Sequence, residues 1–441
     1  MKNLFEIARR ALFRSAAAVL AASLLAACAA TASRAPSAIP AKENPAADDQ
    51  YVILIGLDGL RADAIDRFPD AAPNLRAMAA RGVRAEAMVP VMPSVTFVNF
   101  YSLATGLYAD RTGVVSNYTY SREQARVMAR TEHSQSVWWG GEPIWATAEK
   151  QGVKTGTMFW LGSEAEIAGA RPTYWSPYEH MKPFAERTGE VLRWLSAPPA
   201  ERPRLATIYF HAVDTAEHIY GVGSEEERAA IAEVDEQVGA LVAGVAALGL
   251  ADKTNFIVVS DHGMANAPAE NIVYLDDYIS LDDVFIPAFE GPDGSNRTPM
   301  AHVFVENGDV DGVYDELAAA AVKGPFSVYR REHLPARWRL DNADRTGDIV
   351  VLADESWQLF ARALTAKYPA SPLGGVHGYD RHLPSMAATF IADGPRFADR
   401  AVVEPFDNVE VYGIIAEILG VAPADTDGDI ARVRYFMTPA H

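Results

Sequence analysis

The architecture of this chain follows from Tyr51-Val-Ile-Leu-Ile-Gly-Leu-Asp-Gly-Leu-Arg61, an apolar run that ends in a carboxylate between two glycines. Apolar residues without alternation are typical of a strand covered on both faces, as in a parallel sheet. Open α/β sheets bind ligands just beyond the carboxyl ends of such strands, which is where Asp58 stands. Gly56 and Gly59 would allow a sharp turn and the close approach of another group. A strand followed by an ordinary Asp-Gly turn explains the same residues when they are taken alone.

The same construction recurs further along the chain. Apolar strands are expected at residues 205–213 and 255–260, and each runs into side chains that bind metals. A lone histidine is more often a hydrogen-bonded structural residue than a ligand. Three aspartates and three histidines together suit two divalent cations of the zinc type. The candidate ligands, the last of which lies between glycines, are Asp58, Asp214, His218, Asp261, His262 and His377.

The first 27 residues are typical of an export signal. A basic opening precedes an apolar stretch, residues 15–27, that is too short for a permanent membrane span. The only cysteine, Cys28, directly follows Leu25-Ala-Ala, which resembles the lipobox of bacterial lipoproteins. That resemblance implies acylation of Cys28, and Ala29 after it fits outer-membrane sorting. We therefore expect a periplasmic, membrane-anchored lipoprotein, with an ordinary cleavage site and an incidental cysteine as the alternative.

The rest of the chain is long and apolar enough for a large folded core, since 49% of its 441 residues are hydrophobic. Residues 28–49, rich in alanine, proline and serine, are expected to form a flexible tether. We expect a catalytic core of residues 50–264 and 373–441, interrupted by a small α/β insertion at residues 265–372. Two helices are expected in the core, from Asp66 to Arg81 and from Ser224 to Leu248, the second with its glutamates on a solvated face.

The charge of the chain limits its partners. Without residues 1–27 it carries 35 basic and 57 acidic residues, a net charge of −22. Such a surface repels nucleic acid, so binding to a nucleic-acid duplex is not expected. An anionic substrate would need local positive charge, which bound metals can supply.

Thr96 is a candidate nucleophile. Two prolines precede a cluster of small hydroxyl residues, and a helical stretch starts close to Thr96. Its hydroxyl would therefore lie near a helix N-terminus, where an anion is favoured. By itself, a threonine at such a place is more often an N-cap.

Six motifs follow one another in the chain: Gly56-Leu-Asp-Gly-Leu-Arg61, Pro93-Ser-Val-Thr-Phe-Val-Asn99, Gly113-Val-Val-Ser-Asn117, Phe159-Trp-Leu-Gly-Ser163, Ser260-Asp-His-Gly-Met264 and Gly375-Val-His-Gly-Tyr-Asp380. In this order they resemble the nucleotide pyrophosphatase/phosphodiesterase family of the alkaline phosphatase superfamily. The resemblance covers nearly all of the chain after the tether. It implies an α/β fold like that of alkaline phosphatase, with a mostly parallel central sheet sandwiched by helices and the small insertion.

The resemblance also implies roles for the candidate residues. Thr96 would be the nucleophile and Asn117 would donate a hydrogen bond to a phosphate oxygen, although capping of its own loop explains Asn117 equally well. Two positions depart from the family pattern: Glu217 stands where glycine is usual, and Leu161 where proline is common. Two Zn²⁺ ions would be bound: one by Asp58, Asp261, His262 and the hydroxyl of Thr96, which this ion ionises, and the other by Asp214, His218 and His377.

Aromatic residues gather between Trp138 and Tyr178, and most of them are expected in the core. By resemblance, four aromatic residues would instead line the pocket for the substituent that is not transferred: Phe97, Trp160, Tyr178 and Tyr209.

The resulting hypothesis is hydrolysis of phosphodiester and pyrophosphate bonds in nucleotides through a phospho-threonine intermediate, releasing a nucleoside 5′-monophosphate. A choline or phospholipid-type phosphodiesterase and a phosphomonoesterase are alternatives on the same scaffold. A non-catalytic lipoprotein that binds a partner is less favoured, because all seven candidate ligand and nucleophile positions are present.

Overall fold

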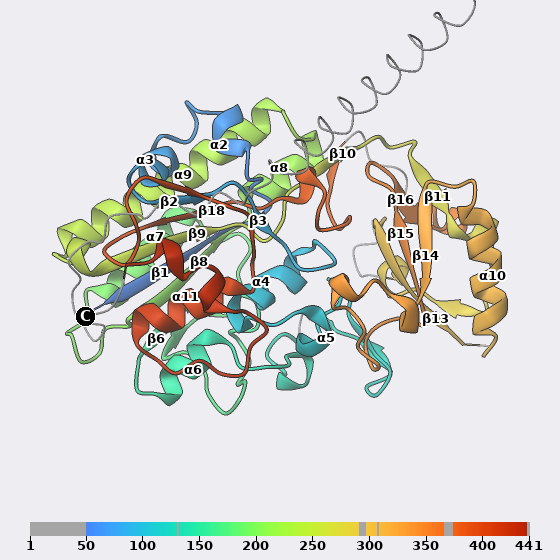
Figure 1. The fold of residues 1–441 in the computed structure, drawn as a ribbon, viewed down its shortest axis with the longest axis horizontal. Coiled ribbons are helices and arrows are strands. Elements are labelled where there is room, and N and C mark those ends of the chain that lie inside the picture. The colour runs from blue at the N-terminus through green and yellow to red at the C-terminus, as the bar shows by residue number, and fades with distance from the viewer. Residues whose placement is uncertain (1–49, 130–131, 291–296, 307, 366–373, 439–441) are drawn as a thin grey trace, which may run out of the picture. The chain divides into compact units, whose positions relative to one another are not determined.

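The structure of the protein is a computed structural model, drawn in Figure 1. The predicted export signal, Cys28 and the tether lie outside the residues that it describes. Of the helices in the described part of the chain, none combines the length and apolar character needed to cross a membrane. The described residues are 50–129, 132–290, 297–306, 308–365 and 374–438.

An eight-stranded sheet with the strand order β19-β2-β18-β9-β1-β8-β6-β7 forms the centre of the fold. Neighbouring strands are parallel except at β18, which is antiparallel to both β2 and β9. This confirms the predicted α/β fold with a mostly parallel sheet. The strands are β1 (Tyr51–Leu57), β2 (Val83–Ala85), β6 (Thr155–Met158), β7 (Tyr174–Trp175), β8 (Leu205–Phe210), β9 (Thr254–Val259), β18 (Phe390–Asp393) and β19 (Ala401–Val403).

Helices cover both faces of this sheet, which explains why its central strands carry unbroken apolar runs (Figure 1). Buried strands of this kind have side chains packed above and below them. One face is covered by α3 (Pro73–Arg81), α7 (Phe184–Leu195) and α9 (Glu225–Ala247), and the other by α4 (Thr96–Thr105), α6 (Ile144–Lys150) and α11 (Glu410–Leu419).

A second, antiparallel sheet lies within the stretch predicted as the insertion. Its strand order is β12-β13-β15-β14, and α10 (Val310–Ala321) packs against it through the buried Val313 and Leu317. A short parallel pair, β11 (Ile272–Tyr274) and β16 (Gln358–Phe360), belongs to the same stretch. The strands of the sheet are β12 (Val284–Phe285), β13 (Met300–Val305), β14 (Phe326–Arg330) and β15 (Ile349–Ala353).

A two-stranded antiparallel ribbon joins the start of this stretch to the residues just after its end. β10 (Ala265–Ala267) pairs with β17 (Gly374–Val376), so that Ala265 lies opposite Val376. The ribbon therefore returns the chain to the end of β9 after more than a hundred residues. Gly374 is needed there, because a Cβ at that position would lie 2.2 Å from the carbonyl oxygen of His218.

The helix predicted from Asp66 to Arg81 is wrong. The structure has two helices in its place, α2 (Ala64–Arg67) and α3. Pro69 lies in the break and Pro73 opens α3, where the N–H that proline lacks is not needed.

The helix predicted from Ser224 to Leu248 is confirmed as α9, and Ser224 caps it by accepting a hydrogen bond from the Glu227 N–H at 3.1 Å. Its glutamates are not all solvated, however. Glu227 is fully buried and accepts two hydrogen bonds from the guanidinium of Arg67, at 2.6 and 3.1 Å. The buried carboxylate is thus paired, as a charge inside a protein needs to be.

His302, on β13, joins the second sheet to the loop that carries Asn117. The Gly347 N–H donates to Nδ1 of His302 at 3.3 Å, and its Nε2 lies 3.2 Å from the Val115 carbonyl oxygen. The ring must therefore be neutral, with its proton on Nε2, because Nδ1 accepts and a carbonyl cannot donate. Burial lowers the pKa of His302 to about 4.

This neutral histidine predicts a loss of stability in acid. Below pH 6.5, the ordinary pKa of histidine, His302 is protonated in the unfolded chain, whereas in the folded chain it stays neutral until the pH nears 4. The stability of the fold therefore falls as the pH falls through that window. Between pH 7 and about pH 4.5 the wild type should lose about 2 kcal/mol more unfolding free energy than His302→Gln. Urea unfolding of both proteins at the two pH values measures the difference. Equal losses would contradict the assignment.

Candidate active site

Three of the predicted ligands lie at the carboxyl ends of the neighbouring strands β1 and β9. Asp58 directly follows β1, and Asp261 and His262 come just after β9. Asp261 accepts a hydrogen bond from the Gly59 N–H at 3.2 Å through Oδ1, and its Oδ2 lies 2.9 Å from Nε2 of His262. Oδ1 of Asp58 lies 3.6 Å from the same nitrogen. Nε2 of His262 therefore faces two carboxylates.

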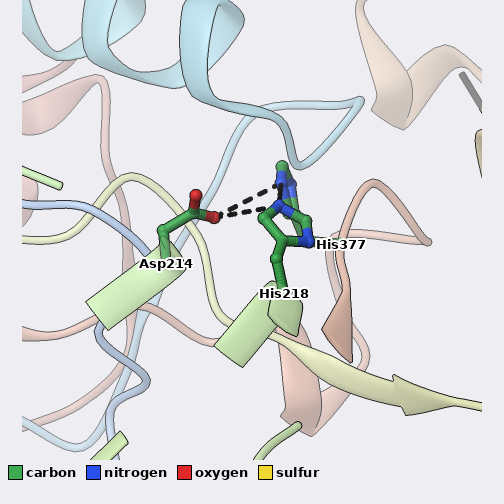
Figure 2. A group of neighbouring side chains, drawn as sticks. All are labelled: Asp214, His218 and His377. Atoms are coloured by element: carbon green, nitrogen blue, oxygen red, sulfur yellow. Dashed lines mark hydrogen bonds and ion pairs between the residues drawn. The ribbon is translucent and has the colours of Figure 1, made fainter. Parts of the chain in front are cut away.

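The other three predicted ligands meet beside them. Asp214 and His218 stand one turn apart on α8 (Ala212–Tyr220), the helix that follows β8. Oδ1 of Asp214 lies 3.2 Å from Nε2 of His218 and 3.6 Å from Nε2 of His377, as Figure 2 shows. Gly59, with φ of +75°, lets the loop after β1 reach α8, because a Cβ there would lie 2.9 Å from Cα of Asp214. The close approach expected from the sequence is thus confirmed at Gly59.

All three histidines present Nε2 to the cluster. Each Nδ1 lies within hydrogen-bond distance of a backbone carbonyl, which can only accept, so Nδ1 carries a proton and, in the neutral ring, Nε2 is left as a metal-binding atom. Proteins orient metal-ligating histidines in this way. The pairs are His218 with Gly375 at 2.8 Å, His262 with Gly263 at 2.9 Å, and His377 with Ser94 at 2.9 Å.

Several buried carboxylate oxygens converge here. Apart from the Nε2 atoms of the three histidines, Oδ1 of Asp58, Oδ1 of Asp214 and Oδ2 of Asp261 have no hydrogen-bond partner among the described residues. In addition, Nε2 of His218 lies only 3.2 Å from Nε2 of His377. Unpaired buried acceptors are costly, and a cation between them removes that cost. Carboxylate oxygens and imidazole nitrogens are a donor set that fits zinc-type cations.

Two groups of ligand atoms are compact enough for one ion each. In each group the atoms lie within 4.8 Å of one another, and Asp214 is common to both. Asp261 adjoins one group through its 2.9 Å contact with His262. The two groups are Asp214, His218 and His377, and Asp58, Asp214 and His262.

The cluster balances its charge with protons when no cation is bound. Burial raises the pKa of Asp58 well above its usual range, and the neighbouring charges of Asp261 and Asp214 raise it further. Burial alone would lower the pKa of His218, but the carboxylate of Asp214 outweighs it and raises that pKa to about 9. A bound divalent cation therefore replaces protons, as is usual for such sites.

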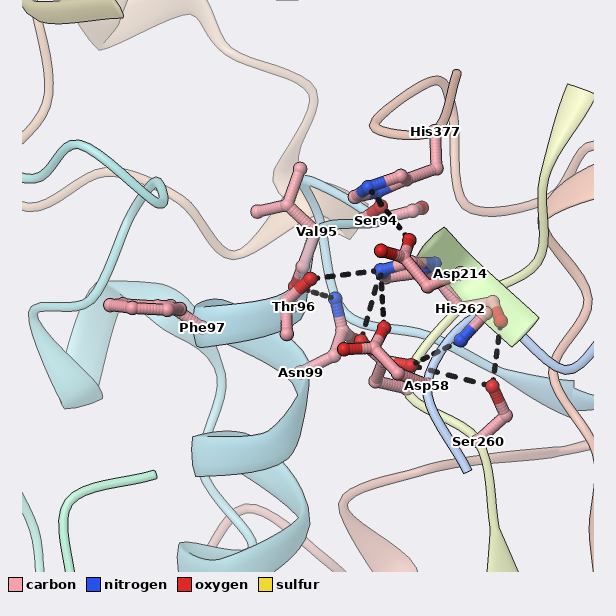
Figure 3. Close-up of polar contacts among 12 residues, drawn as sticks. Asp58, Ser94, Val95, Thr96, Phe97, Asn99, Asp214, Ser260, His262 and His377 are labelled. Atoms are coloured by element: carbon pink, nitrogen blue, oxygen red, sulfur yellow. Dashed lines mark hydrogen bonds and ion pairs between the residues drawn. The ribbon is translucent and has the colours of Figure 1, made fainter. Parts of the chain in front are cut away.

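Thr96 faces this cluster from the first residue of α4 (Figure 3). Its Oγ1 lies 3.2 Å from Nε2 of His262. The N-cap of α4 is Val95, so the structure does not support the simpler interpretation of Thr96 as a capping residue. The hydroxyl instead lies where the helix N-terminus and the candidate ligands meet.

Asn117 lies against the same end of α4. Its Oδ1 accepts a hydrogen bond from the Phe97 N–H at 2.9 Å. Asn117 therefore caps α4 from twenty residues away, whereas the simpler expectation was a cap of its own loop. Because Oδ1 accepts, the NH₂ group is the donor that this side chain can offer to a ligand.

Comparisons with known proteins place the chain in a known family. Residues 52–380 match the family described as type I phosphodiesterase/nucleotide pyrophosphatase. The chain belongs to this family. Venom phosphodiesterase of Naja atra is 34% identical over 392 residues, which cover 88% of this chain and 46% of the venom protein. Family member 3 of the ectonucleotide pyrophosphatases/phosphodiesterases from Bos taurus is 33% identical over 397 residues, with 88% and 45% covered.

The chain thus spans about half the length of the curated relatives that it matches. Among solved structures, murine ectonucleotide pyrophosphatase/phosphodiesterase 5 matches with a TM-score of 0.80 and 27% identity, over 88% of this chain and all of the murine one. That murine protein is an inactive threonine-to-alanine variant in complex with AMP. The two proteins therefore share the alkaline-phosphatase-like fold of the family.

The aromatic residues predicted to line a family-type substrate pocket divide into two groups. Trp160 is only 2% exposed, and its indole N–H donates to the Phe100 carbonyl at 2.9 Å. It lies in the core and has no free face for a ligand, which corrects the predicted pocket. Tyr209 is also buried, and its hydroxyl donates to Oδ2 of Asp58. Tyr209 therefore supports a candidate ligand, a contact that no local sequence signal indicates.

Phe97 and Tyr178 remain accessible. Phe97 is half-buried and points away from the ligand cluster in Figure 3, with its ring edge-on to His133 at 5.1 Å. Tyr178 is 43% exposed, and its ring meets that of Phe159 edge-on at 5.3 Å. These two rings are the members of the predicted pocket that can still contact a ligand.

Glu217, which departs from the family pattern, does not disturb the site. It lies within α8 and is fully buried. Burial raises its pKa well above the usual range, and the neighbouring carboxyl of Glu227 raises it further. The side chain thus faces α9, while Asp214 and His218 keep their places in the cluster.

Proposed function

We propose that this family member is a zinc-dependent hydrolase of phosphodiester and pyrophosphate bonds in nucleotides, and that it releases a nucleoside 5′-monophosphate. The observation that carries the proposal is the Thr96 hydroxyl, held 3.2 Å from His262 within a buried group of carboxylates and imidazoles. Relatives named phosphodiesterase support it. So does the solved murine relative, which is inactive without a threonine and was obtained with AMP.

Two Zn²⁺ ions are proposed at the two ligand groups. Bound divalent cations would lower the pKa of the Thr96 hydroxyl and offset negative charge on the phosphoryl oxygens. The buried acceptors without donors and the inward Nε2 atoms support a cation there. We assign Asp58, Asp261 and His262 to one ion, and Asp214, His218 and His377 to the other.

In the proposed reaction, Oγ1 of Thr96 attacks phosphorus while the bond from phosphorus to the leaving oxygen breaks. The product is phospho-Thr96 that still carries the nucleoside on its phosphorus, and water then attacks this phosphorus, restores the hydroxyl and releases the nucleoside 5′-monophosphate. The N-terminus of α4 places the positive end of the helix dipole beside the phosphoryl group. The NH₂ group of Asn117 donates a hydrogen bond to a phosphoryl oxygen.

A diester fits this site better than a monoester. A monoester carries an additional negative charge on the transferred group, which calls for a further cation. Within the described part of the chain, no lysine or arginine hydrogen-bonds to Thr96 or Asn117. The second substituent of a diester could stack on Phe97 and Tyr178, which contributes about 1 to 3 kcal/mol per base in single-strand binders. The same rings could hold a choline head group by cation–π attraction.

A panel of three substrates tests this proposal. We expect kcat/KM for p-nitrophenyl thymidine 5′-phosphate to exceed the values for p-nitrophenyl phosphorylcholine and p-nitrophenyl phosphate by at least about tenfold, the effect of 1.4 kcal/mol of stacking. Steady-state rates of the zinc-loaded protein under one set of conditions give the comparison. A higher kcat/KM for the monoester would refute the assignment as a diesterase, and a higher value for the choline ester would refute the assignment to nucleotides. No turnover of any of the three would favour a non-catalytic binding protein.

We also propose a bacterial lipoprotein that is anchored to the envelope membrane through acylated Cys28. Leu25-Ala-Ala-Cys28 after the apolar stretch supports this proposal. We expect the wild type in the membrane fraction and Cys28→Ala in the soluble fraction, because the variant has no sulfur to acylate. Immunoblots of fractionated cells measure the distribution. An unchanged membrane fraction would show that the anchor lies elsewhere.

A further inference from the structure

Arg187 is a buried arginine that has no acidic partner in the described part of the chain. It lies in the first turns of α7 and is fully buried. Among the described residues, no carboxylate forms an ion pair with it, although arginines this deeply buried are normally paired. Burial lowers its pKa, so the position is costly for a guanidinium. Such a residue must be held there by other contacts.

The guanidinium donates instead to three backbone carbonyls. Nε donates to Lys182 at 3.0 Å and Nη2 to His180 at 2.8 Å, both in the segment before α7. Nη1 donates to the carbonyl of Tyr209 at 2.9 Å, near the end of strand β8. Because the five donors of a guanidinium lie in one rigid plane, these bonds fix the segment 180–182 against the end of β8.

Aromatic rings hold the guanidinium in this plane. Its Cζ lies 5.0 Å from the ring centre of Phe159 and 4.8 Å from that of Phe184. Cation–π attraction of this kind is strongest where water is excluded. A lysine has its three donors on a single nitrogen, so it could not reach three carbonyls from three separate nitrogens, and it offers no flat face to the two rings.

Three residues that Arg187 contacts also contact the Tyr178 side chain: Phe159, Tyr209 and His180. The ring meets Phe159 edge-on at 5.3 Å and Tyr209 at 6.1 Å, and its hydroxyl lies 2.8 Å from Nδ1 of His180. Arg187 binds the carbonyls of Tyr209 and His180 and lies over Phe159. Since Tyr209 also donates to Asp58, the Tyr178 ring is tied to the candidate metal cluster.

We propose that Arg187 is a positioning residue that determines selectivity for the substituent that stays on the transferred phosphorus. It holds the exposed Tyr178 ring in the orientation in which a flat base stacks on it beside the reacting phosphorus. This inference rests on the proposed function and adds the residue that makes the site prefer a nucleotide over a small diester. Arg187 touches neither the phosphoryl group nor the candidate ligands, so the chemical step should not depend on it.

The test compares Arg187→Lys with the wild type on two diesters, p-nitrophenyl thymidine 5′-phosphate and methyl p-nitrophenyl phosphate. The variant should raise KM for the thymidine ester and lower its kcat/KM at least about tenfold, while kcat/KM for the methyl ester stays within about threefold. Zinc content should not change. Arg193→Lys, on the exposed face of the same helix, is the matched control and should change neither substrate.

A double-mutant cycle identifies the path of the effect. In a Tyr178→Ala background, Arg187→Lys should cause no further loss with the thymidine ester, because the ring that it positions is gone. Should Arg187→Lys fail to fold, Phe184→Leu removes one ring from the guanidinium and should shift selectivity in the same direction, by a smaller factor.

The outcomes separate this inference from the proposed function. Equal losses with both diesters would show a merely structural role for Arg187 and overturn the inference, as would unchanged selectivity. A wild type that does not prefer the thymidine ester over the methyl ester would refute the nucleotide assignment itself, whatever the variant does.

Discussion

Thr96→Ala is expected to lower kcat for p-nitrophenyl thymidine 5′-phosphate by at least about 1,000-fold, because a methyl group cannot attack phosphorus. The variant should keep its bound zinc, since none of the six carboxylate and imidazole ligands is altered. The 3.2 Å contact of Oγ1 with Nε2 of His262 is lost, but that nitrogen still faces Asp58 and Asp261. Steady-state kinetics together with metal analysis of the same sample measure both effects.

Thr96→Ser is the matched control, because it keeps a hydroxyl at the N-terminus of α4. It should retain part of the activity, and the wild type quenched with acid during turnover should carry thymidine 5′-phosphate esterified to Thr96. Phosphate trapped on another residue, or an alanine variant that turns over at the wild-type rate, would overturn the assignment of the nucleophile.

His377→Ala is expected to lose metal and activity together. The side chain contributes Nε2 to the group with Asp214 and His218, and its removal leaves the inward carboxylate of Asp214 with one imidazole fewer. Because even an outer partner of a ligand is worth about 10- to 100-fold in affinity or rate, we expect the loss of a ligand to cost at least about 100-fold in both. Zinc per chain and the zinc concentration that restores chelated protein give the measurement.

The control for this variant is His382→Ala, five residues along the same stretch. His382 is exposed and belongs to neither ligand group, so its removal should leave zinc content and rate unchanged. A fully active preparation that contains no metal would end the metal hypothesis for the whole site.

The main sheet and the meeting of the candidate ligands were predictable because both depend on local patterns. An unbroken apolar run followed by Asp58 or Asp261 indicates a buried strand and its carboxyl end, and parallel neighbours bring such ends together. The break between α2 and α3 could also be predicted from the sequence, since Pro69 and Pro73 lie inside the range of the predicted helix. The two prolines, and not the apolar spacing, decide where the first helix ends and the second begins.

Other features have no local signal. Trp160 is fixed by a carbonyl sixty residues away in sequence, so its place in the core depends on packing that the chain pattern does not contain. The same holds for Glu227, which is drawn inward by Arg67 from a distant helix although it belongs to a run of exposed glutamates. The hydroxyl of Tyr209 on Asp58 is a third case. Long-range partners decide each of these positions.

The ribbon of β10 and β17 has a consequence for how this chain tolerates changes of length. Since Ala267 lies opposite Gly374, the chain between them leaves and returns at neighbouring points, so residues can be added to or removed from the exposed loops of that stretch without moving His377. Within the ribbon the opposite holds. Side chains alternate between the two faces of a strand, so deletion of a single residue from β17 would shift the register by one and turn the following segment over. Insertions should therefore be accepted between the strands, and no change of length within them.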